Sequence, residues 1–303
     1  MLPSEHASRE SWLFYDRGDS AGFTDGRAMT DHTAEIIDQS QPSIARVYDY
    51  LLGGKDNYAA DRKIGDFFIK DLPGSQAIAF ANRQALTRAV GSMAQDGIHQ
   101  FVDMGSGLPT ADNVHQVAQR HYAAARVAYV DNDPIVLAHG RALLATDDRT
   151  AVIQADLREP EPIHDHPDVA KLIDFDQPVG VIFSAILHHL NDDERPADLV
   201  RWWADRAPSG SQVYISHFRS GENEATRVAE QKLQATFGRG RWRTDEEIIG
   251  LFGDLELLEP GLVTCPLWRP GFAPGGDVAT TEDDERAPTV WEQMISCALA
   301  RKP

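Results

Sequence analysis

The chain of 303 residues has few cysteines, few basic residues and no long apolar run. Its two cysteines, Cys265 and Cys297, lack metal-ligand spacing, which predicts reduced thiols in a reducing compartment and no metal site. The 29 basic residues stand against 47 acidic ones, a formal net charge of −18, so nucleic acid is not an expected partner. Without a membrane-length apolar run, and with the polar start MLPSEHASRE, the chain is expected to be soluble and cytoplasmic.

What the chain does have is a strand, a glycine turn and a helix start in one stretch, QFVDMGSGLPT over residues 100–110. Phe101 and Val102 suit a buried parallel strand, and Gly105 and Gly107 let the backbone approach a ligand closely. The helix that follows presents free N–H groups at its start. This pattern predicts a cradle for a nucleotide-type cofactor, although such turns also occur in α/β proteins without a ligand.

The turn departs from the dinucleotide pattern GxGxxG, because Thr110 stands where the third glycine would be. That glycine allows close helix packing beside a pyrophosphate. A cofactor that has no pyrophosphate, such as S-adenosylmethionine, tolerates the change.

Acidic residues follow the next two expected strands. The stretch 126–131 (RVAYVD) ends in Asp131, where a carboxylate commonly accepts hydrogen bonds from ribose hydroxyls. Asp133 precedes a proline and is expected to cap the next helix. The stretch 151–155 (AVIQA) is followed by Asp156, which can bind an exocyclic adenine amine. These acids favour an adenosine-containing cofactor.

Further apolar stretches complete a sheet. Residues 178–185 predict a central strand and residues 212–216 a fifth one. Two strand-like stretches close the chain, 255–268 and 290–300, with a loop rich in proline, glycine and acids over 270–288. They fit an antiparallel hairpin at a sheet edge.

The N-terminal part is expected to precede this sheet as two further regions. Residues 1–41 are polar and predict a flexible tail with one apolar knot at 12–15 (WLFY). Residues 42–97 predict three helices that form a cap, the first with Ser43 as its N-cap, and residues 98–303 the sheet domain. The polar cluster KDNY, residues 55–58, is either an ordinary solvated turn or part of a lid.

These motifs together resemble a bacterial family of S-adenosylmethionine-dependent methyltransferases of class I. The motifs that carry the resemblance are PSIARVYDYLLGGKDNYAADR (42–62), Asn82-Arg83, QFVDMGSGLPT, YVDNDPIVLAHGRALL (129–144), QADLREP (154–160), LHHL, and the close EPGLV…WRP with ALARKP. The resemblance implies a Rossmann-like α/β fold: a seven-stranded, mostly parallel sheet with an antiparallel C-terminal hairpin, and an N-terminal helical cap.

The same resemblance implies where S-adenosylmethionine binds and leaves its acceptor, which we expect to be a small molecule, undefined. For residues 55–58, the resemblance favours a cover of the active site over an ordinary solvated turn. The implied contacts, by part of the cofactor, are Asp103, Gly105, Ser106 and Gly107 for the methionine part, Asp131 and Asn132 for the ribose, Asp156 and Leu157 for the adenine, and Ser184 beside the sulfonium.

A general base is expected only for some acceptors, such as a hydroxyl or an ammonium. His188, His217 and Tyr58 are the candidates, in falling order of preference. Three functions compete: a small-molecule methyltransferase, a nicotinamide oxidoreductase, and a cofactor-binding sensor without turnover. The missing third glycine and the terminal hairpin speak against the oxidoreductase. The sequence names neither the acceptor nor the oligomeric state.

Overall fold

The computed structural model describes residues 39–72, 74–110, 112–144, 147–220, 224–272 and 287–303. Residues 37–303 form one compact unit, so the predicted cap of 42–97 and the predicted sheet domain of 98–303 lie within it together. Most of the predicted N-terminal tail, its apolar knot included, and most of the loop over 270–288 lie outside the described residues.

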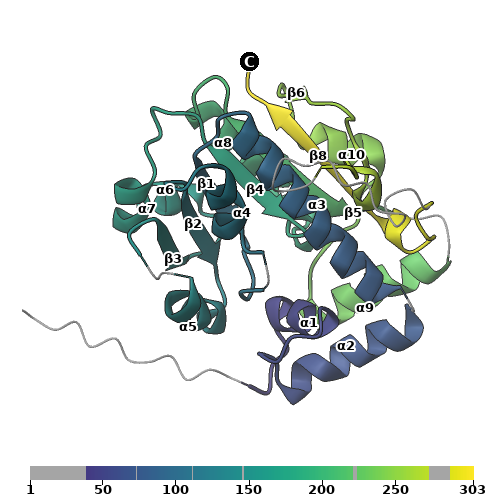
Figure 1. The fold of residues 1–303 in the computed structure, drawn as a ribbon. Helices are drawn as coiled ribbons and strands as arrows, with labels where there is room; N and C mark the ends of the chain where they lie inside the picture. The colour runs from purple at the N-terminus through teal and green to yellow at the C-terminus, as the bar shows by residue number, and fades with distance from the viewer. Residues whose placement is uncertain (1–38, 73, 111, 145–146, 221–223, 273–286) are drawn as a thin grey trace, which may run out of the picture. The chain divides into compact units, whose positions relative to one another are not determined.

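The core of this unit is a mixed sheet in the strand order β3-β2-β1-β4-β5-β8-β6, with β7 also paired to β8 (Figure 1). β1 to β5 are parallel, and β8 runs antiparallel to β5, β6 and β7. The strands are β1 (Gln100–Met104), β2 (Arg126–Asp131), β3 (Thr150–Gln154), β4 (Gly180–Ser184), β5 (Gln212–Phe218), β6 (Glu256–Leu257), β7 (Val263–Thr264) and β8 (Ile295–Arg301). The predicted parallel sheet with an antiparallel C-terminal end is confirmed.

The count differs by one from the predicted seven strands. The stretch expected as one strand over 255–268 contributes two short strands, β6 and β7, and both pair with β8. Between them lies the turn Glu259-Pro260-Gly261, in which Pro260 has no N–H for a ladder and Gly261 has a φ of +77°. The interruption is therefore local, and the architecture is unchanged.

Alternate side chains of the strands enter two hydrophobic cores, one on each face of the sheet. In β4, Ile182 belongs to one core, whereas Val181 and Phe183 belong to the other. This period of two is what an extended backbone imposes, and helices on both faces explain why the strands are apolar throughout. The described part of this unit is thus a three-layer α/β/α arrangement.

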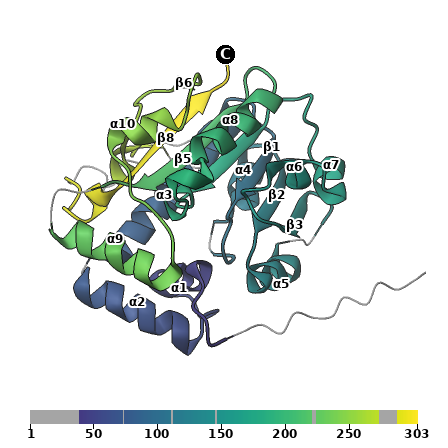
Figure 2. The ribbon, with the colours of Figure 1, turned by 180° about the vertical axis from the view of Figure 1, so that it is seen from behind.

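Different helices cover the two faces. α3 and α4 supply the first core, and α6, α7 and α8 supply the second (Figure 2). The helices are α1 (Ile44–Leu51), α2 (Ala59–Asp71), α3 (Ser75–Gln95), α4 (Val114–His121), α5 (Pro134–Leu143), α6 (Pro160–His164), α7 (Pro167–Leu172), α8 (Pro196–Arg206), α9 (Glu224–Phe237) and α10 (Asp245–Gly250), with 3₁₀ turns η1 (Leu187–His189), η2 (Asp192–Glu194), η3 (Cys265–Leu267) and η5 (Glu292–Met294). Within the described ranges, every helix is too short or too polar to cross a membrane.

The three predicted N-terminal helices are present as α1, α2 and α3. α1 packs against α2, and Lys232 of α9 lies over the ring of Phe67 of α2 at 4.5 Å. Both ribbon views place α1 and α9 beyond the carboxyl ends of the parallel strands (Figures 1 and 2). Ligands of open α/β sheets bind outside these strand ends, so α1, α5 and α9 border the place where a ligand is expected.

Candidate functional site

The glycine turn after β1 is fastened to the end of β2. The N–H groups of Gly105 and Ser106 donate to the carbonyl of Val130 at 2.8 and 3.1 Å, and Gly107 N–H donates to Asp131 Oδ2 at 2.9 Å. Gly105 has a φ of +70°, and a Cβ there would lie 2.5 Å from Ile186 Cγ1. Gly107 has a φ of +66°, and a Cβ there would meet nothing within 4 Å. The turn therefore leaves open space on one side of Gly107.

Asp131 and Asp133 share the turn after β2. Asp131 Oδ1 accepts the N–H of Asp133 at 2.9 Å, and Asp133 Oδ1 accepts the N–H of Ile135 at 2.8 Å. The predicted cap of α5 by Asp133 is confirmed. Burial raises the pKa of Asp131 to about 6, although the hydrogen bonds from Asp133 and Gly107 favour its charged form. Asn132, between the two acids, is exposed.

Asp103 lies at the end of β1 and is 4% exposed. Burial raises the pKa of its carboxyl to about 7; the positive charge of Arg83 on α3 opposes this shift, and the negative charge of Asp131 adds to it. Two carboxyls with raised pKa thus flank the glycine turn. Such a pair favours a bound cation, because a positive charge would stabilise their ionised forms.

Asp156, after β3, is in a different state. Its carboxylate accepts Arg158 Nε at 2.9 and 3.0 Å, and Arg158 holds the pKa of Asp156 below its usual range. Arg158 Nη1 also donates to Glu194 Oε1 at 2.8 Å. Leu157 packs at the margin of the second core. Asp156 is therefore already paired with Arg158.

Ser184, at the end of β4, belongs to a polar network that sequence reasoning did not predict. Asn82 of α3 donates to Ser184 Oγ at 3.3 Å and to the Tyr48 hydroxyl at 3.0 Å, and it accepts the hydroxyl of Ser216 at 2.6 Å. Tyr48 in turn donates to the carbonyl of Ala79. Asn82 was part of a quoted motif, but nothing in the sequence indicated its partners on α1, β4 and β5.

The backbone after Ser184 is strained. Ala185 has a φ of +51°, which a non-glycine residue rarely adopts, and its N–H donates to Ser216 Oγ at 2.8 Å. Strain of this kind persists where surrounding bonds impose it, and it is common at functional sites. The polar network thus holds the end of β4 in an unusual shape beside the glycine turn, since the side chain of Ile186 faces Gly105.

His188 and His217 are both buried, 1% and 0% exposed. His217 Nδ1–H donates to the carbonyl of Phe218 at 2.7 Å, and Nε2 accepts from Arg243 Nη1 at 3.0 Å. Burial lowers the pKa of His217 to about 3 and holds the pKa of His188 well below its usual value. Both ring nitrogens of His217 are engaged, a geometry that favours a structural role.

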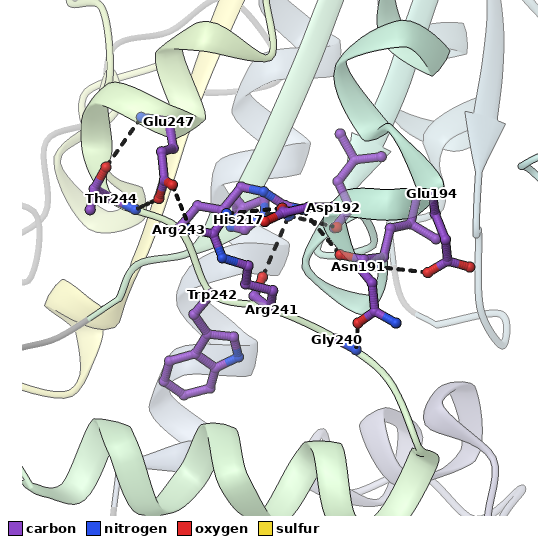
Figure 3. A network of polar contacts seen from close by, with 12 residues as sticks. Asn191, Asp192, Glu194, His217, Gly240, Arg241, Trp242, Arg243, Thr244 and Glu247 are labelled. Carbon is purple, nitrogen blue, oxygen red and sulfur yellow. Dashed lines mark hydrogen bonds and ion pairs between the residues drawn. The ribbon is translucent and has the colours of Figure 1, made fainter.

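Arg243 is the centre of the network that holds the ring of His217 (Figure 3). Its buried guanidinium donates to Asp192 Oδ1 at 2.9 Å and to the carbonyls of Leu187 and Leu190 at 3.2 and 3.1 Å. Figure 3 shows the side chain reaching His217 and Asp192 while neighbouring Trp242 points away. Arg243 therefore fastens the turn that contains LHHL to the segment before α10.

Tyr58, the third candidate base, lies near the glycine turn and the start of α5. Its ring packs in a small apolar cluster with Leu108, Ile135 and Val136. In the same polar segment, Asp56 Oδ2 lies 3.4 Å from His139 Nδ1 of α5. This places residues 55–58 beside the turns that carry the predicted ribose and methionine contacts.

A groove of about 810 Å³ lies at the opposite edge of the sheet, lined by His99, Gln100, Tyr122, Arg126 and Lys171 among others. These residues belong to the amino ends of β1 and β2 or to nearby turns, except Lys171, which lies in α7. We place the site at the carboxyl ends of the strands instead. The glycine turn and the buried acids Asp103 and Asp131 lie there, and ligands of parallel sheets bind there. In the described part of the chain, no three His, Cys, Asp or Glu side chains are placed to hold a metal ion.

Comparison with known proteins shows which proteins share this sequence pattern and this fold. The sequence pattern of the family "S-adenosyl methyltransferase" matches residues 30–303. A crystal structure of a "putative methyltransferase" from Thermobifida fusca YX is 43% identical with a TM-score of 0.80, covering 88% of this chain and 97% of its own. A DUF574 family protein from Streptomyces avermitilis MA-4680 is 35% identical with a TM-score of 0.78, covering 88% and 100%. Among curated proteins, none matches.

Proposed function

The chain belongs to the S-adenosyl methyltransferase family, whose cofactor is S-adenosylmethionine, and on this basis we propose that it transfers the methyl group to a small-molecule acceptor. One observation carries the proposal. The glycine turn, open at Gly107, lies between the buried carboxyls of Asp103 and Asp131, whose pKa values are raised to about 7 and about 6. The cofactor brings an ammonium group and ribose hydroxyls, which suit these two acids.

The residues fit the cofactor as follows. Asp103 pairs with the ammonium of the methionine part, and Gly105, Ser106 and Gly107 line it with backbone. The Asp131 carboxylate keeps lone pairs for the ribose hydroxyls beside the two backbone N–H groups it already accepts. Asn132 adds a contact to the ribose, Asp156 and Leu157 border the adenine, and Ser184 lies next to the sulfonium.

Bound S-adenosylmethionine supplies an electrophilic methyl group on its sulfonium. The chain itself has to hold the acceptor atom behind that methyl and exclude water, and such positioning contributes roughly 7–11 kcal/mol. The network of Asn82, Ser184, Ser216 and Tyr48 suits this task because its members fix one another's orientation. We assign acceptor positioning to this network.

His188, His217 and Tyr58 remain predictions as general bases. His217 would first have to lose Arg243, and the lowered pKa of either histidine makes it a weak base. Tyr58 lies on the Asp131 side of the glycine turn, where contact with the adenosine is the simpler role. Positioning without a histidine base suits an acceptor that carries a free lone pair at neutral pH.

Calorimetry of S-adenosylhomocysteine binding tests the proposal. Wild type should bind at micromolar level and should not bind NAD comparably. Asp131→Ala removes charge-assisted hydrogen bonds worth about 1.5–3 kcal/mol, so affinity should fall roughly ten- to hundredfold. Tight NAD binding without a response to S-adenosylhomocysteine would refute the proposal.

Turnover separates the enzyme from a sensor. Release of S-adenosylhomocysteine should be followed across a panel of small carboxylates, phenols and amines, with Asp131→Ala as the control with weakened cofactor binding. Turnover on any member supports methyl transfer. Cofactor binding with no turnover on a broad panel would point instead to the sensor.

A further inference from the structure

A buried ion cluster joins α1, α2 and α5. Arg46 of α1 donates from Nε to Asp61 Oδ2 of α2 at 2.9 Å, and its Nη1 donates to Asp133 Oδ2 at 3.5 Å. The hydroxyl of Ser43 also donates to Asp133 Oδ2, and the N–H of Ser43 donates to Asp61 Oδ1 at 2.8 Å. Arg46, Asp61 and Asp133 are 4%, 0% and 8% exposed. A guanidinium is thus enclosed between two carboxylates from two other segments.

Ser43 shows that this cluster prevails over local helix capping. It occupies the predicted N-cap position of α1, but its side chain makes no capping hydrogen bond. Ser43 is therefore the N-cap residue, as predicted, but without the capping hydrogen bond that its side chain could make. The hydroxyl is directed to Asp133 instead, 90 residues along the chain.

Each carboxylate has local partners besides Arg46. Asp61 also accepts the N–H of Tyr58 at 2.8 Å, and Asp133 accepts the N–H of Ile135. The starts of α2 and α5 are thus capped without the arginine. What Arg46 adds, together with Ser43, is the link between the two helix starts, and that link plays no part in capping either helix.

The link leads directly to the predicted ribose contact. Asp133 holds Asp131 Oδ1 through its N–H, and Asp131 Oδ2 holds the N–H of Gly107. Arg46 also lies over the ring of Tyr58, 5.3 Å from its centroid, and that ring packs beside Leu108 of the glycine turn. A displacement of Arg46 would therefore disturb both Asp131, the predicted ribose contact, and the glycine turn.

We propose that Arg46 is a positioning residue of the cofactor site, which holds the Asp131–Asp133 turn through Asp133 and couples the docking of α1 and α2 to cofactor binding. The inference rests on the proposed function, because it takes the turn to be the ribose site. By reciprocity, a bound cofactor stabilises the docking of α1 and α2 as much as their docking strengthens its binding.

The test compares two buried arginines. Arg88 of α3 is 8% exposed and donates to the carbonyls of Trp268 and Cys265 at 2.8 and 2.7 Å, away from the glycine turn. Arg46→Met and Arg88→Met should both lower Tm. Below both melting transitions, calorimetry should show S-adenosylhomocysteine affinity at least about tenfold weaker in Arg46→Met and within about twofold of wild type in Arg88→Met. Arg46→Lys should recover only part of the lost affinity. The ammonium keeps the positive charge, but it lacks the second arm that reaches Asp133.

Hydrogen exchange gives the second readout. With S-adenosylhomocysteine, wild type should gain protection at residues 48–62 and 105–107; in Arg46→Met the gain at 48–62 should disappear. If Arg46→Met does not fold, Ser43→Ala is the variant to test. It removes one hydrogen bond to Asp133 and should weaken the affinity for S-adenosylhomocysteine while the fold remains. Wild-type affinity in folded Arg46→Met, or in Ser43→Ala where Arg46→Met does not fold, would overturn the inference. A wild type that does not bind the ligand would instead overturn the proposed function.

Discussion

The side chains of Asn82 and Ser216, 134 residues apart, are joined by a hydrogen bond of 2.6 Å between the serine hydroxyl and the amide oxygen. Because Asn82 accepts there, its NH₂ group must point to Tyr48 and Ser184. One buried amide from α3 thus orients polar side chains on α1, β4 and β5. Under the proposed function, the space beyond Ser184 that would receive the acceptor depends on this amide.

Asn82→Leu should therefore impair catalysis more than binding. Leucine keeps the volume but leaves the hydroxyls of Tyr48 and Ser216 without this partner, which costs about 1–3 kcal/mol in the free energy of unfolding. With any acceptor that is turned over, kcat should fall on the order of 10- to 100-fold, as for a misplaced reacting group. The affinity for S-adenosylhomocysteine should change far less.

A buried amide at the other edge of the sheet supplies the control for this variant. Gln100 is 2% exposed and bonds to the backbone of Asp174 and Gln177. Gln100→Leu should cost similar stability and leave kcat unchanged. Equal kcat for Asn82→Leu and wild type would remove Asn82 from the acceptor site.

Cofactor affinity should rise with pH. Asp103 has a pKa raised to about 7 by burial, so in the free protein it holds a proton below neutral pH, and pairing with the ligand's ammonium requires that proton to leave. Affinity for S-adenosylhomocysteine should be about tenfold weaker at pH 6 than at pH 8. Titration calorimetry in two buffers of different ionisation enthalpy should show proton release below pH 7.

The stability of the free protein should move in the opposite direction. Between the ordinary carboxyl pKa, about 4, and pH 7, the folded state binds more protons at Asp103 than the unfolded state, so this residue's contribution to stability is lost as pH rises. Asp103→Asn should remove both trends apart from a smaller change near pH 6 from Asp131. An affinity that stays flat in wild type would contradict the assigned pairing.

Gly107→Ala should abolish cofactor binding with only a modest loss of stability. The φ of +66° costs an alanine about 1–2 kcal/mol, and its methyl group would enter the open space assigned to the cofactor. Gly253 is the matched control, with a φ of +56° and also nothing within 4 Å of a Cβ. Chemical unfolding should show similar losses for both variants, and calorimetry a loss of S-adenosylhomocysteine binding for Gly107→Ala alone. Similar affinities would mean that the open side of Gly107 faces solvent.

Much of the fold could be predicted because it depends on patterns within short windows. Continuous apolar runs indicated β1, β2 and β4, and the three helices predicted within 42–97 are present as α1, α2 and α3. Capping chemistry is equally local, so the cap of α5 by Asp133 could be recognised from adjacent residues. The stretch 255–268 was predicted least well, since β6 and β7 have two residues each and such short strands show no detectable period.

What the sequence determined by itself is the layered sheet, the glycine turn and the acids at the strand ends, because each is encoded within a few neighbouring residues. Only the tertiary structure decided which partner each polar side chain takes. It directs Ser43 to Asp133, encloses Arg46 between two carboxylates, and engages both nitrogens of His217. The reason is physical: a buried polar group takes whichever partner the packing of distant elements brings within about 3 Å, and separation along the chain does not encode that distance.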